Sequence, residues 1–219
     1  MVLPDRDRLP WPAPPGGAHH EPMGNRRLSI LALAALAVLA VLGCSSAGPN
    51  AEPSAAPSAA DAILAPYGLA GLDGVALVDR LDRLPVAQRP ADLRVSVRPG
   101  QLLLSDQRTG AEATLALPAD QFYLSVAPYL ERTHECFFHS LTTCRGELGG
   151  RPVAVSITNR ASGEVLVDTT VMTFDNGFAG FWLPAGVEAD IRVAYEGRTV
   201  TAQIGTGSDD PTCLTSLRL

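Results

Sequence analysis

The sequence predicts an α+β fold that is mostly β: a small N-terminal α/β domain with antiparallel hairpins, followed by a C-terminal antiparallel β-sandwich of the prealbumin or immunoglobulin type. Two observations predict it. Helical spacing of apolar residues is confined to one early stretch, and from residue 93 onward apolar and polar residues alternate. Turn signals containing Gly, Asn and Pro then recur at short intervals up to the C-terminus, as is typical of short antiparallel strands.

The N-terminal part reads as an export signal. Residues 28–42 are an apolar run that follows Arg26-Arg27 and ends next to Cys44. The run has the length of a signal-peptide core and is short for a membrane-spanning helix. The residues around Cys44 resemble a lipobox, so Cys44 is the expected lipidation site. Because a Pro-rich stretch precedes Met23, we expect the natural start there.

These features define a leader at residues 1–44 and, from its Ser, Ala and Pro content, a flexible tether at residues 45–60. We therefore expect an exported protein, lipid-anchored to the outer face of the cell membrane in the envelope or periplasmic space. Cleavage by the ordinary signal peptidase, or an uncleaved anchor, are the alternatives. The mature part is predicted to divide into an α+β domain at residues 61–148 and a sandwich at residues 149–219, joined near two glycines.

One helix is predicted in the first domain. Leu77, Leu81 and Leu84 have helical spacing, and Asp73 or Gly74 is placed to cap the N-terminus. The charged residues of this stretch are expected to form a solvated face: Asp79, Arg80, Asp82 and Arg83.

The alternation and the turns predict ten strands. The cysteine-bearing segment, which precedes the fifth strand, is predicted to be an irregular loop that could hold one helical turn. The strands cover residues 93–98, 101–105, 113–117, 122–127, 153–157, 165–171, 178–183, 191–195, 198–204 and 214–219.

Charge and missing motifs narrow the function. The net charge is −6 and every basic residue is Arg. A surface of that sign repels phosphate backbones, so a nucleic-acid partner is not expected. The sequence contains no nucleophile elbow, zincin helix, phosphate loop or dinucleotide-binding turn, so hydrolase and transferase activities have no residue support.

The strongest chemical signal is residues 133–144. This segment holds Cys136, Cys144, His134 and His139, half of all the cysteines and histidines, and Cys213 could fold back onto it. Sulfur with nearby nitrogen is a ligand set for Cu(I) or Zn(II). A close thiol pair is also the minimum for redox chemistry.

The residues alone leave four readings open. If Cys44 is lipidated, three cysteines remain, and an odd number leaves one thiol reactive or metal-bound. The cysteine count fits a loop disulfide between Cys136 and Cys144 with an idle third cysteine. It fits equally a thiolate Cu(I) site, redox catalysis or a Zn(II) site. His139 could be a ligand or lower a thiol pKa, whereas His134 could simply face solvent.

Three apolar residues near or beyond this segment are expected in the core. Phe137 and Phe138 read as a core plug that could also keep water from a Cu(I) site, and Met172 lies on a predicted strand.

Four further segments carry a family likeness: residues 122–129, 134–148, 173–184 and 209–215. They resemble the CueP family of periplasmic copper-binding proteins, and together the likeness runs from about residue 61 to the C-terminus. The resemblance implies copper handling outside the cytoplasm, with copper sequestered under stress and supplied to exported clients such as a superoxide dismutase. The family's functional cysteines correspond to Cys136, Cys144 and Cys213. Family members have also been linked to Cu(II) reduction and thiol–disulfide exchange.

Our hypothesis is a membrane-tethered copper protein in which the thiolates of Cys136, Cys144 and Cys213 bind Cu(I). His139 is a possible fourth ligand, Zn(II) is the weaker candidate metal, and a homodimer could share the site. The first alternative is a thiol-dependent reductase that uses the Cys136/Cys144 pair. The second is a sandwich scaffold with an inert disulfide.

Overall fold

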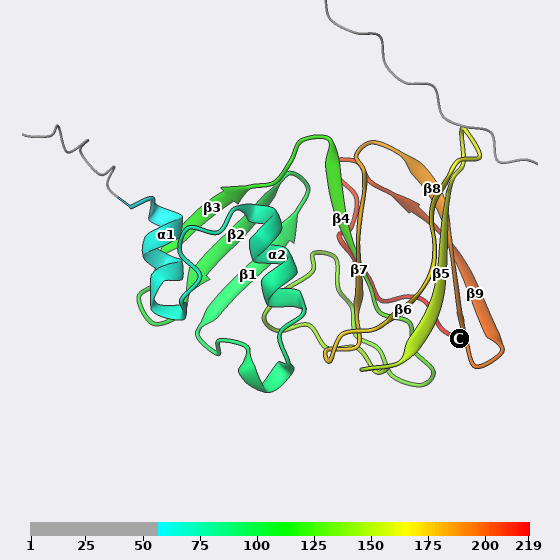
Figure 1. The fold of residues 1–219 in the computed structure, drawn as a ribbon, viewed down its shortest axis with the longest axis horizontal. Helices are drawn as coiled ribbons and strands as arrows, with labels where there is room; N and C mark the ends of the chain where they lie inside the picture. Colours follow the sequence, from blue (N-terminus) through cyan, green and yellow to red (C-terminus); the bar gives the residue numbers. More distant parts are fainter. Residues whose placement is uncertain (1–56) are drawn as a thin grey trace, which may run out of the picture. The chain divides into compact units, whose positions relative to one another are not determined.

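The computed structural model describes residues 57–219 (Figure 1). The predicted leader, the lipidation site Cys44 and most of the predicted tether lie outside the described residues. Within residues 57–219, none of the helices has the length and apolar character needed to cross a membrane.

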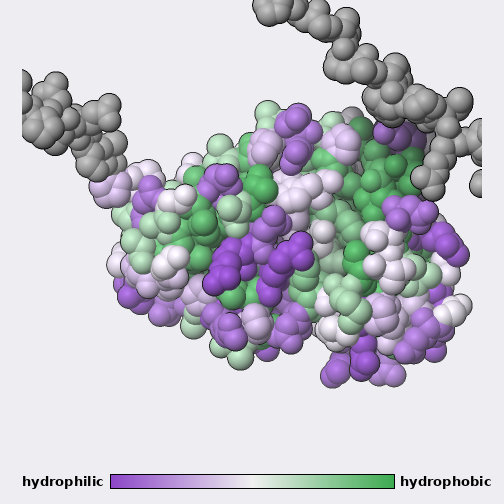
Figure 2. Space-filling model, in the orientation of Figure 1, coloured by the Kyte–Doolittle hydropathy of each residue, from purple (hydrophilic) through white to green (hydrophobic). Residues whose placement is uncertain are grey.

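Two short helices and two 3₁₀ turns precede the strands: α1 (Ala59–Leu64), η1 (Ala65–Tyr67), α2 (Gly74–Asp82) and η2 (Val86–Gln88). The Asp73 side chain accepts a hydrogen bond from the Ala76 amide at 2.8 Å, which confirms the predicted cap of α2. Leu77, Val78 and Leu81 of this helix are fully buried. Hydrophilic side chains cover its outer side (Figure 2), as predicted for Asp79, Arg80 and Arg83.

Ten strands follow, close to their predicted positions: β1 (Leu93–Arg98), β2 (Gln101–Asp106), β3 (Glu112–Ala116), β4 (Gln121–Val126), β5 (Pro152–Asn159), β6 (Val165–Met172), β7 (Ala179–Pro184), β8 (Glu188–Tyr195), β9 (Arg198–Gly205) and β10 (Cys213–Leu214). The last strand is much shorter than predicted. The cysteine-bearing segment is an irregular loop with one hydrogen-bonded turn, in which the Cys144 amide donates to the Ser140 carbonyl at 3.1 Å.

Strands β1, β2 and β3 form an antiparallel sheet, and α1 and α2 lie against one of its faces (Figure 1). Apolar residues from both helices and from the sheet form one core between them. The cysteine-bearing loop extends this sheet, because it hydrogen-bonds to the free edge of β1. The Val97 amide donates to the His139 carbonyl at 2.8 Å, and the Leu141 amide donates to the Val95 carbonyl at 2.9 Å.

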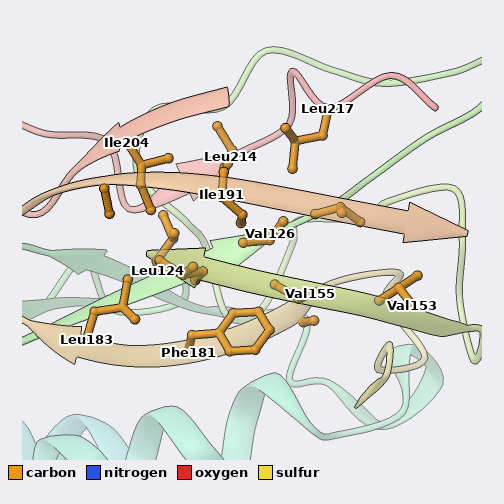
Figure 3. Close-up of a cluster of buried hydrophobic side chains, with 14 of the residues drawn as sticks. Leu124, Val126, Val153, Val155, Phe181, Leu183, Ile191, Ile204, Leu214 and Leu217 are labelled. Atoms are coloured by element: carbon orange, nitrogen blue, oxygen red, sulfur yellow. The ribbon is translucent and has the colours of Figure 1, made fainter. Parts of the chain in front are cut away.

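The remaining strands form the predicted sandwich, from a three-stranded sheet in the order β10-β4-β7 and a four-stranded sheet in the order β6-β5-β8-β9. Figure 3 shows Leu124 and Phe181 of the first sheet meeting Val155 and Ile191 of the second. Strand β4 lies before the predicted domain boundary, yet it is the centre of a sandwich sheet. The division into separate domains at residues 61–148 and 149–219 stays a prediction.

Three predictions about burial were wrong. Met172 is 58 % exposed, because β6 is an edge strand of the four-stranded sheet. Phe137 is 53 % exposed and protrudes from the loop, while the Arg98 guanidinium lies 3.7 Å from the centre of the Phe138 ring. Asp82, expected on the solvated face of α2, has no exposed surface at all.

Candidate metal centre

Non-local strand pairing brings the predicted ligands together. Cys136, His139 and Cys144 lie on the loop between β4 and β5, and Cys213 opens β10. Strand β10 runs parallel to β4, with Cys213 paired to Ser125. The Cys213 amide donates to the carbonyl of Phe137 at 3.2 Å, so the last strand and the loop are held directly against each other.

Thr212 links strand β1 to the cysteine-bearing loop and to β10. Its hydroxyl donates to the carbonyl of Val97 at 2.8 Å and accepts from the amide of His139 at 3.0 Å. Thr212 has no exposed surface. A single buried threonine therefore ties β1, the cysteine-bearing loop and β10 together next to the sulfur atoms.

The three sulfur atoms form one cluster. Cys136 and Cys213 are joined by a disulfide with 5.6 Å between their Cα atoms, and Cys144 is free. The Sγ atom of Cys144 lies 3.5 Å from that of Cys136 and accepts from the Ser140 amide at 3.3 Å. The bridge thus links the loop to the last strand, and the alternative Cys136–Cys144 bridge is not formed.

His139 lies on the inner side of the cluster and has no exposed surface. Its Nε2 atom lies 3.1 Å from Oδ1 of Asp82, and its Nδ1 atom lies 3.8 Å from Sγ of Cys213. A carboxylate can only accept, so Nε2 carries the hydrogen toward Asp82. This leaves Nδ1 directed at the sulfur atoms, the arrangement in which a carboxylate orients a metal-binding imidazole.

Asp82 is the polar centre beneath the site. Its carboxylate accepts from the Tyr123 hydroxyl at 2.7 Å and from the Asn176 side-chain amide at 2.9 Å. The guanidinium of Arg89 lies 3.5 Å from Oδ1. Four elements of the chain thus converge on one fully buried carboxylate.

Arg89 extends this network to the cysteines. Its guanidinium donates to the carbonyls of Asp82 at 3.0 Å and of Cys144 at 3.3 Å, and only 3 % of its side chain is exposed. Sequence reasoning missed both Asp82 and Arg89. The signal for Asp82 was its position four residues after Val78, which places it on the buried face of α2.

These contacts shift the pKa values of His139 and Cys144. Burial alone would lower the pKa of His139, but the Asp82 carboxylate and Cys144 outweigh burial and raise this pKa to about 9. Burial alone would raise the pKa of Cys144, but His139 and the Ser140 amide outweigh it and lower this pKa. The site therefore favours an imidazolium next to a thiolate, the state in which a cysteine is nucleophilic and binds metals.

The possible ligands fall into two overlapping sets. One set is His134, Cys136 and Cys144, and the other is His139, Cys144 and Cys213; within each set the ligand atoms lie within 4.8 Å of one another. His134 is exposed, whereas Cys213 is only 2 % exposed. The structure thus brings together all four predicted ligands and adds His134.

A glycine pair positions the turn that carries Asn176. A Cβ atom at Gly177 would lie 2.5 Å from the carbonyl oxygen of Gly146, and Gly177 has a φ of +80°. The amide of Gly146 donates to the carbonyl of Asn176 at 2.6 Å. Close backbone contact therefore holds the chain just after Cys144 against the turn.

We expect Gly177→Ala to lower the free energy of unfolding by more than about 2 kcal/mol, because the left-handed backbone alone costs roughly 1–2 kcal/mol and the clash with Gly146 adds to it. Gly163→Ala is the matched control, since Gly163 has a φ of +73° and nothing within 4 Å of its added Cβ. Urea unfolding of both variants measures the difference. Equal losses would show that the contact with Gly146 is unimportant.

A family model described as periplasmic copper-binding protein CueP matches residues 76–218. A solved structure described as "Crystal Structure of S.CueP" is similar at 41% sequence identity and a TM-score of 0.69, covering 75% of this chain and 99% of that one. No curated protein matches.

Proposed function

This chain belongs to the CueP family of periplasmic copper-binding proteins, and on that premise we propose that it binds Cu(I) through the thiolates of Cys136, Cys144 and Cys213 after their disulfide is reduced. One observation carries the proposal: three sulfur atoms from distant parts of the chain meet in one cluster. Two-electron reduction turns the Cys136–Cys213 bridge into two further thiols beside Cys144.

The chemistry of the donor set favours Cu(I). Soft thiolates select Cu(I), whereas Zn(II) usually takes four ligands in a tetrahedron. His139 is the candidate fourth ligand through Nδ1, which faces Cys213 while Asp82 holds Nε2. Zn(II) is therefore the weaker competitor, and it would need His139 in addition to the three thiolates.

The apolar surroundings also suit a Cu(I) site. Ala127 and Phe178 are buried and pack with Cys213, and the Phe178 ring lies 4.6 Å from the His139 ring. A water-poor environment keeps the thiolates from competing ligands and protects Cu(I) from oxidation. This packing supports sequestration as the role of the site.

We extend this role to copper resistance in the periplasm and to supply of copper to exported clients such as a superoxide dismutase. The predicted lipid anchor at Cys44 would hold the protein at the outer face of the cell membrane. Both statements rest on the family and on the sequence, since residue 44 lies outside the described part of the chain.

A second candidate function is thiol-dependent reduction of Cu(II), supported by the Cys136–Cys213 disulfide with Cys144 at 3.5 Å. In this reaction Cys136 and Cys213 each give one electron to a Cu(II) ion. The products are one disulfide, two Cu(I) ions and the two protons released from the thiols. The Cys136/Cys144 pair could do the same, because Cys144 can attack the bridge at Cys136 and release Cys213.

The proposal is tested by competition between the fully reduced protein and a coloured Cu(I) chelator, with Zn(II) titrated alongside. We expect tight Cu(I) binding that is lost when all three cysteines are replaced by Ser. Circular dichroism of the triple variant controls for folding. Unchanged Cu(I) affinity in a folded triple variant would rule out the thiolate site, and binding no tighter than that of a generic thiol protein would favour the reductase or an inert scaffold.

A further inference from the structure

We propose that His134, with Cys136 and Cys144, forms an outer Cu(I) site that captures the ion and passes it inward to Cys213. The inference rests on the proposed function and adds a route for loading and release. It starts from the two overlapping ligand sets, which share Cys144 and differ in exposure. His134 is exposed, Cys136 and Cys144 are partly buried, and Cys213 is buried.

His134 is held in place although it is exposed. The hydroxyl of the preceding Thr133 donates to the carbonyl of Thr215 at 2.6 Å. Just before it, the Glu147 carboxylate accepts from the amides of Leu130 and Glu131 at 2.7 and 3.0 Å, and from that of residue 132 at 3.3 Å. These bonds fix the backbone leading into His134, whose ring nitrogen lies within 4.8 Å of the Cys136 and Cys144 sulfur atoms.

The Phe178 ring is a neighbour of both histidines. Its ring centre lies 6.3 Å from that of His134 and 4.6 Å from that of His139, and Phe178 has no exposed surface. Of the two histidines near this ring, His134 is exposed and His139 is fully buried. An ion that arrives from solvent would meet His134 before it could reach His139 or Cys213.

A cavity opens on the side of His134. It has a volume of about 540 Å³ and its lining includes His134, Arg132 and Arg145. Among the described residues, neither arginine takes part in an ion pair within 4.0 Å. Glu147 also lines the cavity, so two guanidinium groups and one carboxylate leave it with one excess positive charge in a chain whose net charge is −6. This charge would attract an anionic Cu(I) complex, so the cavity is placed to receive copper from an anionic carrier.

The inward step is a single ligand exchange. The bond from Cu(I) to the imidazole of His134 breaks as a bond to Sγ of Cys213 forms, while the bonds to Cys136 and Cys144 remain. Copper stays Cu(I), and the Cys213 thiol gives up its proton, which the released imidazole or water takes. Because the ion keeps at least two thiolates throughout, it never has to leave the protein to exchange partners.

Stopped-flow transfer of Cu(I) from its bicinchoninate complex, which is anionic, to the reduced protein tests the route. We expect His134→Ala to slow both capture and release at least tenfold, while the dissociation constant stays within about threefold. X-ray absorption of the loaded variant should show the same number of sulfur ligands as the wild type. Glu135→Ala is the matched control, because Glu135 is the exposed neighbour and belongs to neither ligand set.

Three results would overturn the inference. Unchanged transfer rates in His134→Ala would show that His134 is outside the route. Faster release with a matching loss of affinity would make His134 a ligand of the resident ion instead. If the wild-type protein itself fails to bind Cu(I) tightly, the proposed function is wrong, and this outcome is distinct because it appears before any variant is compared.

Discussion

Reduction of the Cys136–Cys213 disulfide is expected to lower the free energy of unfolding by about 4 kcal/mol, and Cu(I) is expected to restore much of it. The two cysteines are 77 residues apart. In the chain-entropy model, a bridge that closes a loop of this size stabilises the folded state by about 4 kcal/mol, since it restricts the unfolded chain. Without the bridge, short β10 is held by its pairing with β4, its contacts with the loop and the packing of Leu214 in the sandwich core.

Cu(I) would replace the lost cross-link because its proposed ligands are the same residues. A ligand that binds only the folded state adds about 4 kcal/mol at a free concentration a thousand times its dissociation constant. The metal would thus join the loop to β10 much as the disulfide does. Among residues 57–219 the oxidised protein offers a single free thiol, Cys144, so copper should stabilise it far less.

Urea unfolding of oxidised, reduced and Cu(I)-loaded reduced protein measures these differences. Cys136→Ser/Cys213→Ser, which keeps Cys144, is the control, and its stability should respond neither to reductant nor strongly to Cu(I). Equal stability of the oxidised and reduced proteins would mean that β10 is held by its packing alone. Stabilisation of the oxidised form by Cu(I) as large as that of the reduced form would place the metal elsewhere.

The fold was largely predictable because its signals are local. Alternation located the strands, and Asp73 followed by apolar residues at helical spacing located α2. The length of the last strand was overestimated, since its apolar pattern continues after the sheet pairing ends at Leu214. Beyond that point the chain makes a single isolated bridge, between Tyr129 and Arg218.

The candidate site was predictable only as a set of ligands. Residue counting singled out the three cysteines and His139. The disulfide partner of Cys136 was not predictable, because it depends on the parallel pairing of β10 with β4. The role of Asp82 was missed for a related reason: all of its side-chain partners lie outside α2, and a charged residue on a helix is exposed far more often than buried.

Asp82→Ala is expected to lower the free energy of unfolding by about 3–5 kcal/mol, the cost of removing one member of a buried ion pair. The substitution would leave Arg89 and His139 without their buried counter-charge. Tyr123 and Asn176 would lose the acceptor of their hydrogen bonds as well. Thermal and urea unfolding of the reduced, metal-free protein measure this loss.

Asp79→Ala is the matched control, because Asp79 lies on the same helix and is exposed, so this substitution should change stability by less than about 0.5 kcal/mol. Similar losses in the two variants would mean that the buried network contributes nothing beyond an ordinary surface carboxylate. A folded Asp82→Asn protein separates stability from binding, since the amide keeps the shape but loses the charge that orients His139.

We expect Asp82→Asn to weaken Cu(I) binding about 10- to 100-fold, the usual effect of losing the group that orients a metal-binding histidine. The loss should disappear in a His139→Ala background if Asp82 acts on the metal through the imidazole, with which it shares a hydrogen bond. An equal loss in both backgrounds would mean that Asp82 affects the site through Arg89 and the position of Cys144. The double-variant comparison therefore decides whether His139 is a ligand or only a neighbour of the thiolates.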